Sequence, residues 1–213
     1  SLFCVPSEEE YRKEKANADF GKIDDTALNE KILNPAKGTA WDIRSYDFLN
    51  GLTSCNCTTI HPNLLRQEQM NNVNGLFMVC KGGGGKPKNQ EEIESTVGCI
   101  YQIRSYDLAT MTFVKSKNGW IVIDPLGGIE NVRKGLEQFR SKFSNEEGKN
   151  PIKAVMVTHS HVDHYRGIMG LVEDGKCAQE AFYSPGGPYI NTSEKLAIVS
   201  EEPKKYETIT TGE

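Results

Sequence analysis

The chain has 213 residues, a length that suits one domain, or one domain with an appendage. Hydrophobic residues make up 37% and charged residues 25%, which allows a modest core, and the net charge of −4 gives no reason to expect a nucleic-acid partner. The longest apolar runs, such as Trp120–Ile123, are far shorter than the roughly 20 residues of a membrane span. The first residues show neither the basic nor the long apolar region of a signal peptide. We therefore expect a soluble protein whose compartment stays open.

The first 74 residues read as an N-terminal arm. Residues 1–40 are polar and mostly compatible with helix, with little apolar periodicity, so we expect them to lie over another part of the protein. Trp41–Leu52 adds aromatic anchors, and a short helical pattern follows Ile60–Gln67. His61 precedes a proline, where the backbone tends to be extended, and we interpret it as a loop residue and not as a metal ligand.

Two further features of the chain look like sites but have simpler explanations. Cys55 and Cys57 could form half of a thiolate metal site, but no second pair matches them, so we interpret the six cysteines as ordinary free thiols. The glycine run within residues 81–96 resembles a phosphate-binding loop only superficially. Such a loop needs Gly-Lys-Ser/Thr at the start of a helix, whereas Lys86 is followed by Pro87. We expect a solvated linker there.

From residue 75 the pattern predicts an α/β fold. Val132, Leu136, Phe139 and Phe143 form one apolar stripe, which predicts an amphipathic helix packed on a core. A strand before this helix and a strand after it indicate a parallel crossover. The predicted strands are Gly75–Cys80, Val97–Ile103, Thr112–Lys115, Trp120–Asp124, Ile152–Val157 and Ala181–Tyr183, with a hairpin turn at Asn118-Gly119 and a short helix over Gly167–Val172.

The stretch Thr158–Gly167 carries the strongest chemical signal. His159, His161, Asp163 and His164 place four side chains that bind divalent metals within six residues. In open α/β sheets, sites lie beyond the carboxyl ends of the strands, which is where this stretch falls. The alternative is a polar surface loop that happens to hold three of the four histidines. The pattern favours two adjacent metal ions bound from one loop.

Asp124 lies at the carboxyl end of the preceding predicted strand, as the ligand stretch lies after the strand Ile152–Val157. We interpret it as a carboxylate that orients a ligand histidine, and the alternative is a helix-side cap.

THSHVDHYRG after an apolar strand, with WIVIDP upstream, resembles the metallo-β-lactamase superfamily, and more narrowly its zinc-dependent alkylsulfatases. The similarity runs from about residue 17 to residue 175. The segments that narrow it are Ala18–Phe20, Trp41-Asp42, His61–Gln67, Asn71–Phe77, Ile100–Leu108 and Thr112–Val114.

This resemblance implies a fold and a reaction. The fold would be the first half of an αβ/βα sandwich over residues 75–187, after the arm of residues 1–74 and before a polar tail at 188–213 without assignment. It implies two zinc ions, the first held by His159 and His161 and the second by Asp163 and His164, with Asp163 as the candidate catalytic residue. A metal-activated water would hydrolyse an alkyl sulfate ester to alcohol and sulfate. Tyr106 and Asp107 are candidate substrate-pocket residues.

One departure from the family concerns the metal ligands. The family's zinc site needs two glutamates and a histidine from the second half of the fold, and no histidine follows His164. Three alternatives stay open. The first is an alkylsulfatase-like enzyme whose site is completed by missing sequence, a second chain or a homodimer. The second is a structural or interaction module derived from this fold. The third is another hydrolase of the fold, acting on a thioester or lactone.

Overall fold

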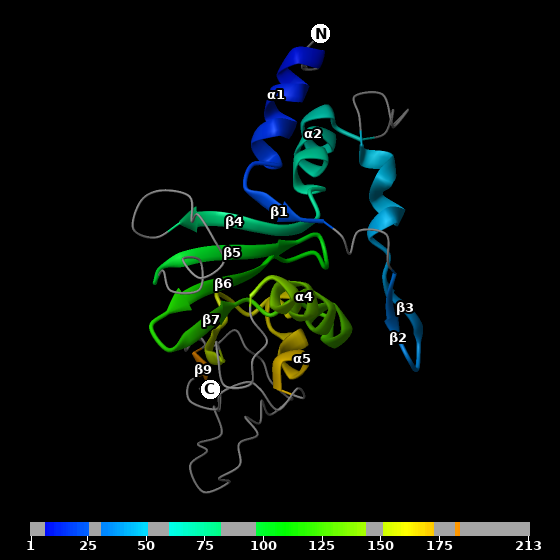
Figure 1. Ribbon diagram of the computed structural model, residues 1–213. Coiled ribbons are helices and arrows are strands. Elements are labelled where there is room, and N and C mark those ends of the chain that lie inside the picture. Colours follow the sequence, from blue (N-terminus) through cyan, green and yellow to red (C-terminus); the bar gives the residue numbers. More distant parts are fainter. Residues whose placement is uncertain are drawn as a thin grey trace, which may run out of the picture.

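The structure is a computed structural model that describes residues 7–25, 31–50, 60–81, 97–143, 151–172 and 182–183. Its centre is a seven-stranded sheet in the order β1-β4-β5-β6-β7-β8-β9 (Figure 1). The first five strands in this order pair antiparallel, and the β7–β8 and β8–β9 pairs are parallel. The bounds are β1 Lys22–Asp24, β4 Gly75–Lys81, β5 Cys99–Arg104, β6 Met111–Ser116, β7 Gly119–Ile123, β8 Ile152–Met156 and β9 Phe182–Tyr183.

The predicted strands from residue 75 onward are therefore confirmed, with shifts of one or two residues at their ends. The hairpin between β6 and β7 is also confirmed, and Ser116 pairs with Gly119 across it. Alternation explains β5 and β6, because buried and half-buried residues follow one another along both strands. The linker at 81–96 lies almost entirely outside the described residues, as do Cys55, Cys57 and the tail at 188–213.

Helix α4 (Ile129–Lys142) covers one face of the sheet, and α5 (Met169–Val172) lies beside it (Figure 1). The predicted apolar stripe faces the sheet, since Val132, Leu136, Phe139 and Phe143 are all at most 3% exposed. The Phe139 ring stacks on Phe113 at a centroid distance of 3.8 Å. This helix carries the chain from the end of β7 to the start of β8, which makes the two strands parallel neighbours.

The N-terminal arm is more structured than its polar sequence predicted. Helix α1 (Glu8–Ala18) begins with a capping box between Ser7 and Glu10, and α2 (Pro62–Asn71) begins with a proline. The two helices pack together, and Lys15 donates to the Gln69 carbonyl at 3.3 Å. Three short strands in the arm were not predicted: β1 extends the main sheet, and β2 (Ile32–Asn34) and β3 (Gly38–Trp41) form a separate hairpin.

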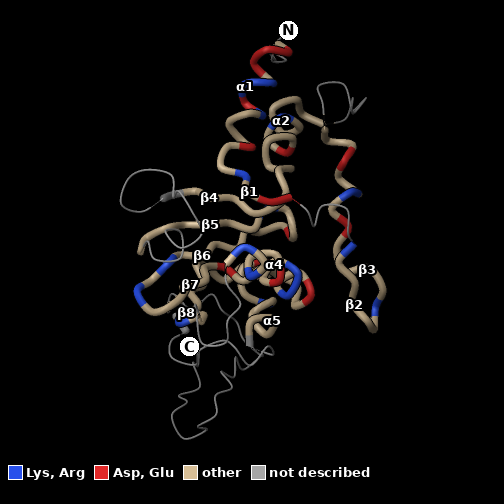
Figure 2. Tube along the Cα trace, in the orientation of Figure 1, with Lys and Arg blue, Asp and Glu red and all other residues tan. Residues whose placement is uncertain are grey.

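The charged residues lie mainly outside the sheet. Figure 2 shows acidic and basic positions along α1 and α4, whereas the central strands are mostly uncharged. None of the helices within the described ranges is long and apolar enough to cross a membrane.

Candidate metal centre

The metal-ligand motif lies in the loop that follows β8. Two short 3-10 turns, Val162–His164 and Arg166–Ile168, follow this strand and end at α5. Because β7 and β8 are parallel neighbours, the loop after β8 lies next to Asp124, the first residue after β7. The backbone N–H of Asp124 donates to the Met156 carbonyl at 2.9 Å. The fold therefore brings together two segments that are far apart in the sequence.

Asp124 is the centre of the hydrogen bonds at this edge of the sheet. It is only 7% exposed, and its carboxylate accepts from the Thr158 N–H at 2.7 Å and from the Thr158 hydroxyl at 2.6 Å. Oδ2 also lies 2.9 Å from Nδ1 of His164. The carboxylate thus fixes the start of the ligand loop and the orientation of one predicted ligand.

The first two predicted ligands meet through one ring nitrogen each. His159 Nε2 lies 3.1 Å from His161 Nδ1, and the two rings are arranged edge to face. The other nitrogen of His159, Nδ1, lies 2.9 Å from the Thr158 hydroxyl. Since that hydroxyl donates its hydrogen to Asp124, it accepts from Nδ1, which leaves the lone pair of His159 on Nε2.

The other two predicted ligands form a second pair. His164 Nε2 lies 3.4 Å from Asp163 Oδ2, while Nδ1 of the same ring is held by Asp124. The rings of His159 and His164 have centroids 4.0 Å apart, so the two pairs are adjacent. Their side chains remain partly open to solvent, with 21% exposure for His164 and 28% for Asp163.

These distances fit two metal ions, with one donor pair for each. Two nitrogens bound at about 2.0–2.1 Å to one tetrahedral zinc ion lie about 3.4 Å apart. The pairs have spacings of 3.1 and 3.4 Å, and imidazole and carboxylate are suitable donors for zinc. Within the described residues, however, no three His, Cys, Asp or Glu side chains form a group that could hold one ion. Each pair taken alone would therefore fill only part of a coordination sphere.

The loop 125–128, which joins β7 to α4, packs under the ligand loop. A Cβ atom on Gly127 would lie 3.1 Å from the Asp163 Cα, and one on Gly167 would lie 2.4 Å from the Pro125 carbonyl oxygen. The Gly167 N–H also donates to the Leu126 carbonyl at 2.8 Å. Glycine at both positions permits this close approach of two backbones.

Backbone strain concentrates around this site. Asp124, Leu126 and Ser105 have φ values of 55°, 52° and 62°, and they are the non-glycine residues with positive φ in the described part of the chain. Two belong to the segment after β7, and the third begins the loop between β5 and β6. Residues held in this region cost about 1–3 kcal/mol each and cluster at functional sites.

Asp107 and Tyr106, the predicted pocket residues, have different surroundings. Tyr106 is fully buried, and its hydroxyl lies 2.5 Å from Gln138 Oε1. Asp107 lines a pocket of about 530 Å³, and its carboxylate accepts from the N–H groups of Gly127 and Gly128. His61 lies elsewhere, where its Nδ1 accepts from the Asn63 N–H at the start of α2.

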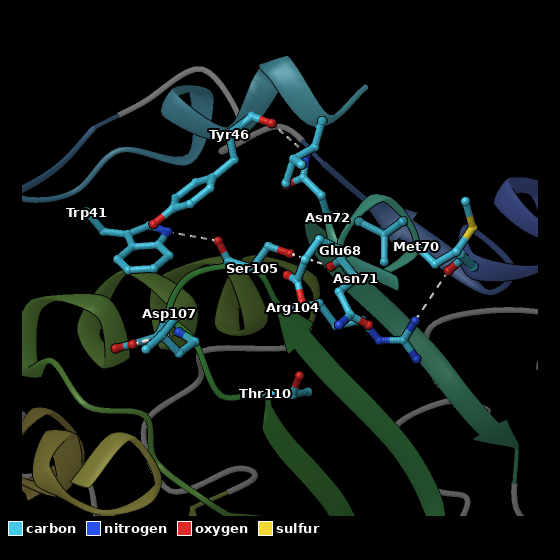
Figure 3. A pocket seen from close by; sticks show the side chains of 14 residues that line it. Trp41, Tyr46, Glu68, Met70, Asn71, Asn72, Arg104, Ser105, Asp107 and Thr110 are labelled. Carbon is cyan, nitrogen blue, oxygen red and sulfur yellow. Dashed lines mark hydrogen bonds between the residues drawn. The ribbon is translucent and has the colours of Figure 1, made fainter. Parts of the chain in front are cut away.

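This pocket lies where the N-terminal arm meets the sheet. Trp41 and Tyr46 stack at a centroid distance of 5.4 Å on one side of it, with Met70 and Arg104 toward the other (Figure 3). Trp41 donates its indole N–H to the Ser105 carbonyl at 3.0 Å, and Ser105 donates to the Asn71 carbonyl at 3.1 Å. Burial lowers the pKa of Arg104 below its usual value. Sequence reasoning named Asp107 but missed the rest of this pocket, because its walls come from four separate segments of the chain.

The chain is similar to known sulfatases. Residues 106–208 match the family model of the metallo-beta-lactamase superfamily. A linear primary-alkylsulfatase from Pseudomonas sp. is 36% identical over 160 residues, which are 74% of this chain and 20% of that protein. The alkyl/aryl-sulfatase BDS1 of Saccharomyces cerevisiae is 30% identical over 75% of this chain and 21% of its own length. The chain thus spans about a fifth of the length of these curated relatives.

A solved structure of a sulfatase is similar to this chain in fold. The stereoselective inverting sec-alkylsulfatase Pisa1 from Pseudomonas sp. matches with a TM-score of 0.52 and 29% identity, over 83% of this chain and 27% of that one. The predicted resemblance to alkylsulfatases and the predicted α/β fold of metallo-β-lactamase type are confirmed by these comparisons.

Proposed function

We propose that this chain belongs to the alkylsulfatase group of the metallo-β-lactamase superfamily and takes part in the zinc-dependent hydrolysis of alkyl sulfate esters to alcohol and sulfate. The observation that carries the proposal is the arrangement of the four predicted ligands as two adjacent donor pairs. One pair is His159 with His161, and the other is Asp163 with His164. The similarity to alkylsulfatases supplies the reaction class.

Each residue of the centre has a proposed part. His159 and His161 would hold one zinc ion, and Asp163 and His164 the other. Asp124 keeps the His164 ring turned so that its Nε2 faces Asp163. Thr158 contacts Nδ1 of His159 and so leaves Nε2 of that ring facing His161. Zinc supplies Lewis-acid chemistry that activates water near neutral pH and offsets the negative charge of a sulfate ester. The proposed catalytic residue is Asp163, the carboxylate among the four donors, whose Oδ2 lies 3.4 Å from His164 Nε2.

The alkyl group of the substrate would occupy the pocket beside Trp41 and Tyr46. Asp107 connects the pocket to the metal centre, because it lines the pocket and its carboxylate bonds the loop 125–128 under Asp163. Leu49, Val73 and Leu108 add apolar side chains to its lining. Its volume of about 530 Å³ is within the usual range for pockets that bind small organic molecules.

Each donor pair supplies two of the four ligands that zinc ordinarily takes in proteins. We propose that the others come from outside the described residues, through further sequence, a second chain or a second copy. In the same way, we propose residues 75–187 as half of the catalytic domain and residues 1–74 as the arm that closes the pocket.

A second candidate function is a non-catalytic interaction module derived from this fold. It is favoured by one observation: no group of three metal-binding side chains is present among the described residues. Such a module would bind no zinc tightly and would be purified in a stoichiometric complex with another protein.

The test is to measure zinc content and sulfate release from dodecyl sulfate at a submicellar concentration. The His161→Ala variant should be at least about a hundredfold less active, because removing a ligand should cost no less than removing the partner that orients one. The matched control is His61→Ala, which removes a histidine that caps α2 and should leave activity unchanged. Equal activity in wild type and His161→Ala would refute the assignment, and a zinc-free, inactive wild-type protein would favour the module.

A further inference from the structure

The carboxylate of Asp107 joins two loops that border the metal centre and the pocket. Oδ2 accepts from the Gly127 N–H at 3.1 Å, from the Gly128 N–H at 3.0 Å and from Asn131 Nδ2 at 2.9 Å. Oδ1 accepts from the N–H of the neighbouring Leu108 at 2.7 Å. All four partners are donors, and hydrogen bonds to a charged acceptor are stronger than neutral ones. The loop between β5 and β6 is thereby fixed to the loop 125–128.

The position of this carboxylate also suits the start of α4. The helix begins after Gly128, which has no side chain that could cap it. Asp107 therefore supplies, from a distant part of the chain, the negative charge that stabilises a helix N-terminus. The bond to Asn131 reaches into the first turn of the same helix. The backbone of Gly127 and Gly128 is thus determined by a residue some twenty positions earlier.

On its other side, the loop 125–128 packs against the ligand loop at Asp163 and Gly167. The position of a Gly127 Cβ is 3.1 Å from the Asp163 Cα and 3.4 Å from Asp107 Oδ2, so the glycine lies between the two aspartates. The Leu126 carbonyl accepts from the Gly167 N–H at 2.8 Å and holds the end of the ligand loop. A shift of the loop 125–128 would therefore displace Asp163.

We infer that Asp107 is a positioning residue for the metal pair Asp163 and His164, acting through Gly127. It does not touch the ligands itself, and its place in the pocket lining means that the pocket wall and the metal pair are held by one carboxylate. The inference rests on the proposed function, because it assigns a role in binding the zinc ion of that pair.

The test is the Asp107→Asn variant, studied by calorimetric titration with zinc alone. Asparagine keeps the size of the side chain but has only one acceptor oxygen, and its NH₂ group would face N–H donors. We expect the zinc affinity of one of the two sites to fall about tenfold, at the low end of the range for residues that orient a ligand. The His159–His161 site should keep its affinity. The control Asp19→Asn removes an aspartate that pairs with Lys22 at 2.9 Å in the arm, and it should change neither site.

A second variant tests the contact between Gly127 and Asp163, through which Asp107 would act. Gly127→Ala leaves Asp107 intact and places a methyl group against Asp163, so it should weaken the same zinc site. It also serves as the decisive variant if Asp107→Asn does not fold. The double variant should lose less affinity than the sum of the two single losses, because both act on one element.

The outcomes separate this inference from the function on which it rests. A lower melting temperature with unchanged zinc affinity at both sites, in both variants, would mean that Asp107 only stabilises the fold, and would overturn the inference. Wild-type protein that binds no zinc would remove the proposed function, and the inference with it.

Discussion

Nδ1 of His164 lies 2.9 Å from Oδ2 of Asp124, a residue forty positions earlier in the sequence. The contact exists because β7 and β8 are parallel neighbours whose carboxyl ends meet at one edge of the sheet. It turns Nε2 of His164 toward Asp163, which is the arrangement that a shared metal ion requires. Asp124 makes this contact from a left-handed backbone conformation, with φ at 55°, which aspartate tolerates better than most residues.

The Asp124→Asn substitution tests this relationship. Asparagine would place an NH₂ group against the Thr158 donors or the His164 ring, so at least one of these hydrogen bonds would be lost. We expect zinc affinity and alkyl sulfate hydrolysis to fall about 10- to 100-fold. Unfolding free energy should fall by about 1–3 kcal/mol, because buried donors are left unsatisfied. Zinc titration and chemical denaturation measure the two effects separately, and unchanged values in both would contradict the role of Asp124.

Trp41→Ala tests the pocket. It removes the aromatic ring that stacks on Tyr46 and the indole N–H that donates to the Ser105 carbonyl, while the Ser105 hydroxyl keeps its bond to the Asn71 carbonyl. We expect KM for dodecyl sulfate to rise about tenfold or more, as the alkyl chain loses apolar contact, with a smaller change in kcat. Steady-state kinetics measure the split. A drop in kcat at constant KM would place the alkyl group elsewhere.

Phe139→Ala tests which contacts hold α4 on the sheet. The ring is 3% exposed, stacks on Phe113 and meets Trp120 edge to face at 4.9 Å. Its removal should lower unfolding free energy by about 3–5 kcal/mol. Phe20, which is 76% exposed, gives the matched control. The Phe20→Ala variant should unfold with wild-type stability, and an equal loss in both variants would contradict the assigned core.

Burial of Tyr101 should make the unfolding free energy fall at high pH. Burial raises the pKa of Tyr101 above its ordinary value of 10.0. Above pH 10 the unfolded chain releases this proton while the folded chain keeps it, so the contribution to stability is full below pH 10 and falls as pH rises. Tyr101→Phe should show a smaller loss of unfolding free energy between pH 9 and about 11 than wild type. Parallel curves for the two proteins would show that Tyr101 ionises equally in both states.

The elements predicted best from sequence are those whose burial pattern is long and regular. The stripe from Val132 to Phe143 and the alternation in β5 and β6 are signals that one segment carries alone. The strands β1, β2 and β3 have three or four residues each, too short for a period to show. β1 forms because a distant strand pairs with it, as Phe77 does with Lys22, and β2 and β3 form because they pair with each other.

The candidate site also has one part that the sequence predicts and one part that it does not. The ligand motif is visible in sequence because its four donors lie within six residues. The partners of Asp107 are not, because Gly127 and Gly128 offer only backbone N–H groups, which leave no trace in a sequence. Tyr106 stands next to Asp107 in the chain but points into the core, so adjacency in sequence gave no guide to the pocket.

The most direct test is a zinc titration of the protein by calorimetry, repeated with His161→Ala and Asp163→Ala. We predict two zinc ions per complete wild-type protein, and one for each variant, because each substitution removes a donor from a different pair. The two variants should lose different zinc ions, so the double variant should bind none. Two ions bound by both single variants, or none bound by the complete wild-type protein with the segment or partner that supplies the remaining ligands, would contradict the metal centre.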